Sequence, residues 1–370
     1  MKICLVAEHY PPHIGGVEIV FAEYAEHLVR RGHDVRVITS DSGGISGTET
    51  VGNLTIHRIQ CHSFFGHPLI PKSSIAEHVR WADIVHTTTY TASLPALCLA
   101  KKFKKPCLLT VHEAIGKQWF SVEPNPLMAL GFLFFEWFVI KRDYSHWHAI
   151  SKATENDLID IGIPKEKIAL IYNGIDTKIW NKQTEPRDLN SLFGFDPSMK
   201  VFLYNGRPGK SKGVFLLLDT IRSVRNKIPA HFRFGFILSK KPEDGRKRFE
   251  QTVRKHDLGD IVRIHDPLPY EDLPGYRKAA YAFIVPSLTE GFGFTAAETS
   301  ILDVPIISSD AGSLPEVVSG KVLFFKNGDS AELEKKIILA ANGAFERISK
   351  KRFSWDESAD KLESLYTSLL

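Results

Sequence analysis

The sequence alternates short apolar runs of strand length with segments of helical periodicity, and this alternation recurs along most of the chain. From Val17 to Arg31, for example, apolar residues recur at helical spacing and Gly32 follows at the usual helix end. Strand–helix–strand connections of this kind give a parallel sheet that is covered by helices on both faces. The first half therefore predicts an α/β domain with strands at Lys2–Ala7, Asp34–Thr39, Leu54–Gln60, Ile84–Thr88, Pro106–Val111 and Trp147–Ile150.

The alternation stops after Tyr172-Asn173-Gly174-Ile175-Asp176 and starts again near residue 197. We expect a first Rossmann-like domain over 1–175, a polar linker over 176–196, and a second Rossmann-like domain over 197–350. The remaining residues, 351–370, predict a C-terminal helix that packs back on the first domain. In the second domain we expect helices at Gly213–Arg225 and Phe294–Leu302, and strands at Val201–Asn205, Arg233–Leu238, Val262–His265, Tyr281–Pro286, Pro305–Ser309 and Val322–Phe325.

Composition narrows the class of protein. The formal charge of +4 is too small and too dispersed to indicate nucleic-acid binding. The four cysteines have no metal-binding or disulfide spacing, so we expect reduced thiols in the cytoplasm. The longest apolar run, Pro126–Ile140, contains Glu136 and falls short of the ~20 residues that span a bilayer.

The loop after the first expected strand contains Gly15-Gly16 directly before a helix. Paired glycines there allow backbone N–H groups to approach an anion, but a turn that needs positive φ would also use them. The dinucleotide fingerprint G-x-G-x-x-G is missing from this loop, which argues against an NAD-dependent dehydrogenase.

The loop Asn205–Gly213 begins the second domain and contains Arg207, Lys210 and Lys212. It is no P-loop, because Tyr204 stands where the Walker pattern requires glycine. Cations at a helix N-terminus oppose the helix dipole unless an anion joins them. A phosphate site is therefore favoured over a solvated basic loop.

The segment from Glu290 to Glu298 reads Glu-Gly-Phe-Gly-Phe-Thr-Ala-Ala-Glu and predicts a glycine turn that leads into a helix. N–H groups of the turn could bind phosphate or hydroxyl oxygens, and a carboxylate such as Glu298 could accept ribose hydroxyls. An ordinary helix start would explain neither the two glycines nor Phe292 and Phe294, which we expect to be exposed.

With its E-x7-E spacing, this segment resembles the signature of the retaining GT-B glycosyltransferases of family 4. The resemblance extends over the whole chain and implies two Rossmann-like doubly wound domains that face a central cleft. It rests also on motifs that follow in the family's order, namely Gly15-Gly16, Tyr172–Asp176, Gly206-Arg207 with Lys212-Gly213, and Ala311–Val318. One departure lies at Leu302-Asp303-Val304-Pro305, where the family usually has a glycine ahead of the proline. We expect that difference to affect the end of the helix.

The resemblance implies roles for these residues. Arg207 and Lys212 would hold the donor diphosphate, Glu298 its ribose, and Glu290 the sugar near its reacting carbon. His112 would contact the donor sugar, although its position alone would suit a structural histidine. The implied donor site comprises Gly15, Gly16, Arg207, Lys212, Glu290, Gly291, Phe292, Gly293, Phe294, Thr295 and Glu298, and the catalytic group Glu290, His112, Arg207 and Lys212.

The family is similar in requiring no metal or other cofactor, and the donor is a nucleoside-diphosphate sugar. Retention would follow from front-face attack, in which the donor's own phosphate takes the acceptor proton. A nucleotide-sugar 2-epimerase of the same architecture and a non-catalytic nucleotide-sugar-binding subunit remain as alternatives.

The acceptor is expected to be lipid-linked or a glycan. Lys101-Lys102-Phe103-Lys104-Lys105 and the apolar helix Met128–Ile140 suit peripheral association with the inner face of the cell membrane. Both also suit a dipole-favoured helix end and a core helix, so the sequence leaves membrane association open.

Overall fold

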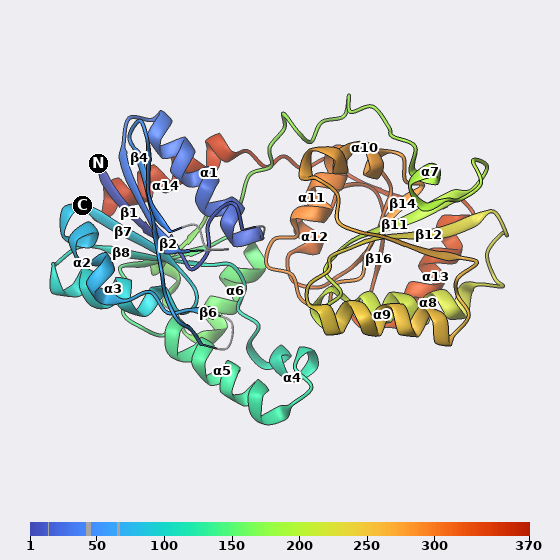
Figure 1. The fold of residues 1–370 in the computed structure, drawn as a ribbon, viewed down its shortest axis with the longest axis horizontal. Helices are drawn as coiled ribbons and strands as arrows, with labels where there is room; N and C mark the ends of the chain where they lie inside the picture. Colours follow the sequence, from blue (N-terminus) through green and yellow to red (C-terminus); the bar gives the residue numbers. More distant parts are fainter. Residues whose placement is uncertain (14, 42–45, 65–66) are drawn as a thin grey trace. The chain divides into compact units, whose positions relative to one another are not determined.

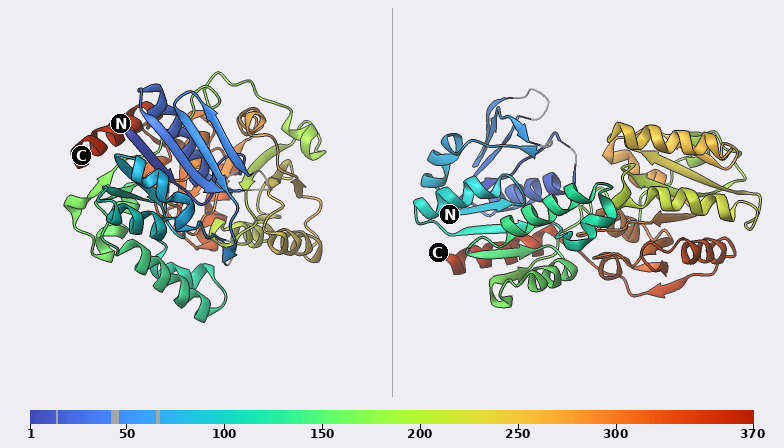
Figure 2. Two further views of the ribbon diagram at one scale, coloured as in Figure 1. Left: turned by 60° about the vertical axis from the view of Figure 1, so that its left-hand side comes forward. Right: turned by 90° about the horizontal axis from the view of Figure 1, so that it is seen from below.

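The computed structural model describes residues 1–13, 15–41, 46–64 and 67–370. By its internal contacts the chain divides into two compact units, each built around a sheet (Figures 1 and 2). The first unit comprises Met1–Gly174 together with Phe353–Leu370, and the second comprises Ile175–Arg352. The second unit is therefore inserted between two pieces of the first.

Among its described residues the first unit has an eight-stranded sheet in the order β10-β9-β8-β7-β1-β2-β4-β3. Neighbouring strands are parallel except that β3 runs antiparallel to β4. β5 and β6 form a separate antiparallel pair. The elements are β1 (Lys2–Val6), α1 (Gly16–Arg30), β2 (Asp34–Ser40), β3 (Gly47–Val51), β4 (Leu54–Ile59), β5 (Ser63–Phe64), β6 (His67–Pro68), α2 (Lys72–Trp81), β7 (Ile84–Thr88), α3 (Ser93–Lys102), β8 (Cys107–Val111), α4 (Trp119–Val122), α5 (Pro126–Ile140), β9 (His146–Ala149), α6 (Lys152–Ile161), β10 (Ile168–Leu170) and α14 (Trp355–Leu369).

The second unit, every residue of which is described, has a seven-stranded sheet in the order β13-β12-β11-β14-β15-β16-β17. Only β17 is antiparallel to its neighbour within this unit. Figure 1 shows α8, α9 and α13 on one face of this sheet and α10, α11 and α12 on the other. The elements are α7 (Leu189–Phe193), β11 (Lys200–Gly206), α8 (Val214–Val224), β12 (Phe232–Leu238), α9 (Glu243–Lys255), β13 (Val262–His265), α10 (Leu273–Lys278), β14 (Ala282–Val285), α11 (Phe294–Ile301), β15 (Ile306–Ser309), α12 (Leu314–Val317), β16 (Gly320–Phe325), α13 (Ser330–Ala341) and β17 (Glu346–Ile348).

Local sequence explains where several helices begin and end. The side chain of Ser151 caps α6 by accepting a hydrogen bond from the N–H of Thr154, and the helix ends at Gly162 with a φ of 89°. The central strands β7 and β8 are buried along their whole length, as expected for strands covered on both faces. The polar edge strand β3 was not predicted, because its side chains are exposed and carry no apolar pattern.

Residues 176–196, which we expected to be a linker, lie within the second unit. Trp180 is fully buried there, and its indole N–H donates to the hydroxyl of Tyr270 at 2.7 Å. The segment also forms α7, which is capped by the side chain of Asp188 and ends at Gly194. The polar composition of this stretch concealed one buried tryptophan and one short helix.

The C-terminal helix α14 belongs to the first unit. Its Tyr366 is fully buried, and the hydroxyl lies 2.6 Å from Nδ1 of His86 on β7. Near its start, the hydroxyl of Ser358 donates to the carbonyl of Tyr172 at 2.5 Å. The first contact ties this helix to the sheet, and the second ties it to the segment that follows β10.

Candidate donor site

The second sheet changes direction between β11 and β14, since the chain proceeds outward from these two neighbouring strands to opposite edges. Open α/β sheets bind ligands at such a switch point, beyond the carboxyl ends of the strands. The loops that follow β11 and β14 are the ones that the sequence singled out.

These two loops are packed backbone to backbone. The N–H of Leu288 donates to the carbonyl of Ser211 at 2.7 Å. Gly213 has a φ of +63°, and a Cβ there would lie 1.7 Å from the carbonyl oxygen of Pro286. Only glycine can occupy position 213 at this distance. The backbone next to Lys212 therefore packs directly against the loop after β14.

Lys212 and Glu290 form an ion pair at this junction. Nζ of Lys212 lies 2.9 Å from each carboxylate oxygen of Glu290, and the hydroxyl of Ser287 donates to Oε2 at 3.0 Å. The side chains are 28% and 12% exposed, respectively. A cation and a carboxylate are therefore fixed side by side and remain within reach of a ligand.

The backbone of Glu290 is fixed by the loop that precedes α12. The N–H and the hydroxyl of Ser313 both donate to the carbonyl of Glu290, at 3.1 and 3.2 Å. Gly312 has a φ of +50°, and a Cβ there would lie 2.2 Å from the same carbonyl. This geometry explains why a glycine-containing motif follows β15.

Arg207 lies in the same loop as Lys212 and is exposed. Its carbonyl accepts a hydrogen bond of 3.0 Å from the hydroxyl of Tyr204. Burial raises the pKa of Tyr204, and the nearby carboxylate of Glu290 adds to the rise, whereas Arg207 opposes it. The structure thus gathers Arg207, Lys212 and Glu290 around one switch point.

The glycine turn leads into α11 as expected, with Gly293 at the N-cap and a φ of 82°. The expectation that both phenylalanines are exposed is wrong for Phe292, which is 2% exposed, while Phe294 is half-buried. Their rings pack edge to face at 5.0 Å. The two rings therefore anchor the turn, and Gly291 is buried beside them while Thr295 is half-buried.

Glu298 is 2% exposed and sits in a buried polar network. Its Oε1 accepts from the hydroxyl of Tyr270 at 2.8 Å, and its Oε2 accepts from Arg277 at 2.7 Å. Arg277 also donates to Asn205 at 2.8 Å, which connects α11 to the end of β11. Burial raises the pKa of Glu298, and the charge of Arg277 opposes that rise.

Sequence reasoning missed Tyr270, Arg277 and Trp180 as parts of this network. Arg277 lies in a short helix that carries little periodicity, and Trp180 lies in the supposed linker. A lone tryptophan in a polar stretch was the one available signal.

The end of α11 shows the effect of the departure from the family pattern. Asp303 takes the place of the usual glycine and has a φ of 62°, a left-handed conformation that glycine adopts more easily. Its carboxylate pairs with Lys350 at 2.6 Å. Asp303 thus adopts at the end of α11 the backbone conformation that glycine favours, and Lys350 pairs with its side chain.

In the first unit, Gly15 precedes α1 and Gly16 opens it. A Cβ on Gly15 would lie 2.3 Å from Oε2 of Glu18, and Oε1 of that carboxylate lies 2.6 Å from Nδ1 of His13. Ile14, within the same motif, lies outside the described residues. Because this contact is with the end of a flexible side chain, it does not by itself require glycine at position 15.

His112 directly follows β8, as predicted. Among the described residues, no group forms a hydrogen bond with its buried Nε2. Burial lowers the pKa of His112 to about 3, with a smaller contribution from His148. The imidazole is therefore neutral at pH 7.

The first sheet has its own switch point between β1 and β7, and Glu8 occupies it. Oε1 of this carboxylate accepts from the N–H of Tyr90 at 2.9 Å and from the N–H and hydroxyl of Thr91, the latter at 2.7 Å. Glu8 is 7% exposed. The sequence analysis missed it, although a carboxylate directly after the first buried strand was a usable signal.

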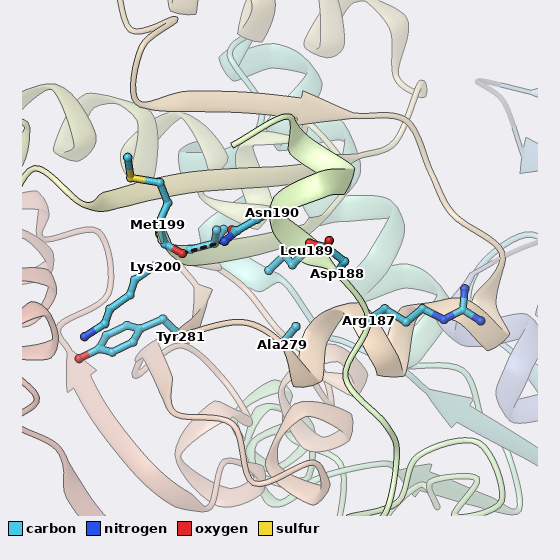
Figure 3. Close-up of a pocket in the computed structure, with 9 residues that line it drawn as sticks. Arg187, Asp188, Leu189, Asn190, Met199, Lys200, Ala279 and Tyr281 are labelled. Carbon is cyan, nitrogen blue, oxygen red and sulfur yellow. Dashed lines mark hydrogen bonds between the residues drawn. The ribbon is translucent and has the colours of Figure 1, made fainter. Parts of the chain in front are cut away.

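A pocket of about 330 Å³ lies at the opposite end of β11, around Lys200 (Figure 3). Asn190 of α7 borders it and donates to the carbonyl of Met199 at 3.0 Å. Because α/β sheets bind ligands at the carboxyl ends of strands, this pocket is not the candidate donor site.

Across 1–13, 15–41, 46–64 and 67–370, no group of three or more His, Cys, Asp or Glu side chains could hold a metal ion.

The fold and the site define a class, the glycosyltransferases of GT-B fold. Residues 14–179 match the family model "Glycosyltransferase Family 4", and residues 192–362 match "Glycosyl transferases group 1". The chain belongs to family 4 of the glycosyltransferases.

Individual proteins agree with this assignment. The chain is similar to an uncharacterized glycosyltransferase of Methanocaldococcus jannaschii, at 24% identity over 99% of this chain and 98% of that protein. It is also similar to one component of the human phosphatidylinositol N-acetylglucosaminyltransferase, at 23% identity over 99% of this chain and 75% of that protein. Among solved structures, the Anabaena protein HepE in complex with UDP has the same fold, with a TM-score of 0.75, 18% identity and complete coverage of both chains.

Proposed function

We propose that this glycosyltransferase moves a sugar from a nucleoside-diphosphate sugar to a lipid-linked or glycan acceptor, with retention of configuration and without a metal. The observation that carries the proposal is the Lys212–Glu290 pair at the switch point of the second sheet, beside Arg207. A structure of the same fold binds UDP, which supports a nucleoside diphosphate as the donor's leaving group.

Arg207 and Lys212 are proposed to bind the diphosphate. Two cations beside the breaking bond would neutralise the charge that develops on the leaving group, which is the role that a metal plays in other transferases. N–H groups at the start of α11, from Gly291 to Thr295, add donors at the positive end of a helix. Gly15 and Gly16 are proposed to meet the same phosphates at the start of α1.

Glu298 is proposed to bind the ribose. Tyr270 and Arg277 use one lone pair on each of its oxygens, and a carboxylate oxygen can accept a second hydrogen bond. The buried network would hold that carboxylate in one orientation for the ribose hydroxyls.

His112 is proposed to contact a hydroxyl of the donor sugar through Nε2, and Glu290 to lie against the sugar near its reacting carbon. Both oxygens of Glu290 are held by Lys212, and one also by Ser287, which lowers the nucleophilicity of this carboxylate. That environment supports front-face attack over a covalent glycosyl-enzyme. The bond from the anomeric carbon to the phosphate oxygen breaks, the acceptor oxygen bonds to the same face, and the acceptor proton passes to the leaving phosphate.

The acceptor class is supported by one relative, whose name describes transfer of N-acetylglucosamine to phosphatidylinositol. We propose a cytoplasmic enzyme that works at the inner face of the cell membrane.

The first experiment is a thermal-shift panel of nucleoside diphosphates and their sugars with wild type, Lys212→Ala and the control Lys210→Ala. Lys210 is exposed in the same loop. We expect one base to raise the Tm of wild type and the control, and much less that of Lys212→Ala. No shift in folded wild type with any donor would contradict the proposed donor site.

Product analysis then distinguishes the activities. Transfer gives free nucleoside diphosphate and glycosylated acceptor, whereas an epimerase gives an isomeric nucleotide sugar and a binding subunit gives no turnover.

A further inference from the structure

Helix α5 exposes an apolar face and buries its single charged residue. The helix, Pro126–Ile140, is apolar along its whole length apart from Glu136. An ordinary surface helix does the opposite and turns its charged residues to water. Figure 1 shows α4 and α5 together at one edge of the first unit.

The exposed side chains follow helical spacing along one stripe. Leu127, Leu130, Phe134 and Trp137 are three or four residues apart and are 78%, 54%, 62% and 47% exposed. Met128 is 40% exposed at the start of α5, and Phe120 of α4 is 49% exposed. We call these six side chains the α5 apolar face. Scattered single apolar residues are normal on a surface, but a continuous stripe marks a contact surface.

The inward face of the helix is fixed by Glu136, which is 1% exposed. Its Oε1 accepts from the hydroxyl of Tyr90 at 3.0 Å and from the N–H of Ile115 at 2.9 Å, and its Oε2 accepts from the N–H of Gly116 at 2.7 Å. Rotating α5 to hide its apolar stripe would break all three bonds. The outward orientation is therefore built into the fold.

Cations gather where α5 ends. The carboxylate of Asp143 lies 3.1 Å from Nζ of Lys101 and 4.0 Å from Nζ of Lys167, so these lysines meet beside the C-terminus of the helix. Lys141 and Arg142 directly follow α5, and the guanidinium of Arg142 lies 3.4 Å from the ring centroid of Phe138. Four cations and one carboxylate thus lie near the C-terminal end of α5, and two of the cations pair with that carboxylate.

We propose that the α5 apolar face docks the protein on an anionic lipid bilayer, with α5 lying in the plane of the interface. The helix is about 22 Å long, too short to cross a membrane. No helix in the described part of the chain has the length and hydrophobicity that a crossing requires. Apolar side chains with a tryptophan, flanked by cations, match a bilayer surface with acidic headgroups. A protein partner would not require the excess of cations.

That this surface presents a lipid-linked acceptor to the enzyme rests on the proposed function. Binding to the bilayer itself does not.

Vesicle flotation tests the proposal with vesicles of phosphatidylcholine alone and of phosphatidylcholine with phosphatidylglycerol. We compare wild type with the double variant Leu130→Gln/Phe134→Gln, and the control is Leu339→Gln. Leu339 is 42% exposed on α13 of the second unit. We expect wild type and the control to float with anionic vesicles, and the double variant to bind at least about tenfold more weakly. Equal binding by all three proteins, or no binding by wild type, would overturn the proposal.

A second pair of variants tests the cations. Lys101→Gln/Lys167→Gln should bind anionic vesicles about tenfold more weakly than wild type. The control Lys247→Gln, which changes an exposed lysine of α9, should bind as wild type does. Unchanged binding by the lysine variant would overturn the proposal that these cations bind anionic headgroups.

Light scattering without lipid tests whether a second copy of the protein, instead of a bilayer, occupies the α5 apolar face. A dimer that Leu130→Gln/Phe134→Gln dissociates would show that a second copy covers the face, and would overturn the proposal. Nucleotide binding, measured alongside by thermal shift, should be the same in every variant. Loss of vesicle binding with intact nucleotide binding separates this inference from the donor site.

Discussion

The two sheets of this protein each have a switch point with a glutamate, and the two glutamates have opposite environments. Glu8 in the first unit is 7% exposed and accepts hydrogen bonds from backbone N–H groups of the loop after β7. Glu290 in the second unit faces Lys212, and both side chains remain partly exposed. The carboxylate of Glu8 is therefore used up by the first unit's own loop. The charged side chains at the switch point of the second sheet remain accessible to a ligand.

This difference explains why the donor site is assigned to the second sheet. A buried carboxylate that satisfies several N–H groups stabilises a loop but cannot also bind a diphosphate. Lys212 and the exposed Arg207 can bind a diphosphate, because only the carboxylate of Glu290 opposes these two cations.

The largest effect is expected from the second switch point. Replacing Glu290 by Gln keeps the shape of the side chain and removes the charge that positions Lys212, so we expect turnover to fall by about 10²–10³-fold. Release of nucleoside diphosphate with a donor and acceptor measures this. The control is Glu271→Gln, an exposed carboxylate of the same unit. Full activity of Glu290→Gln would contradict the proposal that this residue lies at the reacting centre.

Acid should weaken the first unit more than the second. Burial lowers the pKa of His112 to about 3 and that of His148 to about 4, and holds the pKa of His86 well below its usual value. Below pH 6.5 these side chains bind protons in the unfolded chain and stay neutral in the folded unit, so stability is complete above pH 6.5 and falls with pH. At pH 5.5 His112 and His148 each contribute a loss of about 1 kcal/mol.

Hydrogen exchange resolves the two units. After correction for intrinsic rates, amides of β8 and β9 should lose protection between pH 7 and 5.5, while those of β11 and β12 keep theirs. Equal loss in both sheets would show that the buried histidines are not responsible.

The smallest effect concerns the first switch point. Glu8→Ala leaves the N–H groups of Tyr90 and Thr91 without their acceptor, and we expect a loss of about 2 kcal/mol in the free energy of unfolding of the first unit. Urea denaturation measures it, with the exposed Glu77→Ala as the control. Nucleotide affinity should change by less than about twofold, because Arg207 and Lys212, the proposed diphosphate ligands, belong to the second unit. A strong loss of nucleotide affinity without a loss of stability would show that Glu8 binds the ligand. The two switch points would then not differ in function.

Much of the fold was predictable because buried parallel strands are short apolar runs in any context. The second strand of the first unit, expected at Asp34–Thr39, is found at Asp34–Ser40. Among the missed strands, β3, β10 and β17 are three to five residues long and lie at sheet edges, where burial leaves a weak pattern. The missed β5 and β6 have only two residues each.

The loops after β11 and β14 could be singled out from the sequence by the cations Arg207, Lys210 and Lys212 and by the glycine turn before α11. The structure packs these two loops against each other, and Gly213 and Gly312 stand where a side chain would collide with backbone. The pairing of Lys212 with Glu290 could not be predicted, because 78 residues separate them and only the adjacency of β11 and β14 brings them together. Arg277 was hidden for the same reason, as its partner Glu298 lies on another helix.

The insertion of the second unit between two pieces of the first has a consequence for biosynthesis. During translation the ribosome releases residues 175–352 before α14 emerges, so the second unit can fold while the first still lacks its last helix. Until then His86 has no Tyr366 to bind, and the side of α1 that α14 packs against stays open to chaperones or to proteases. The part of the protein that is made first is therefore completed last.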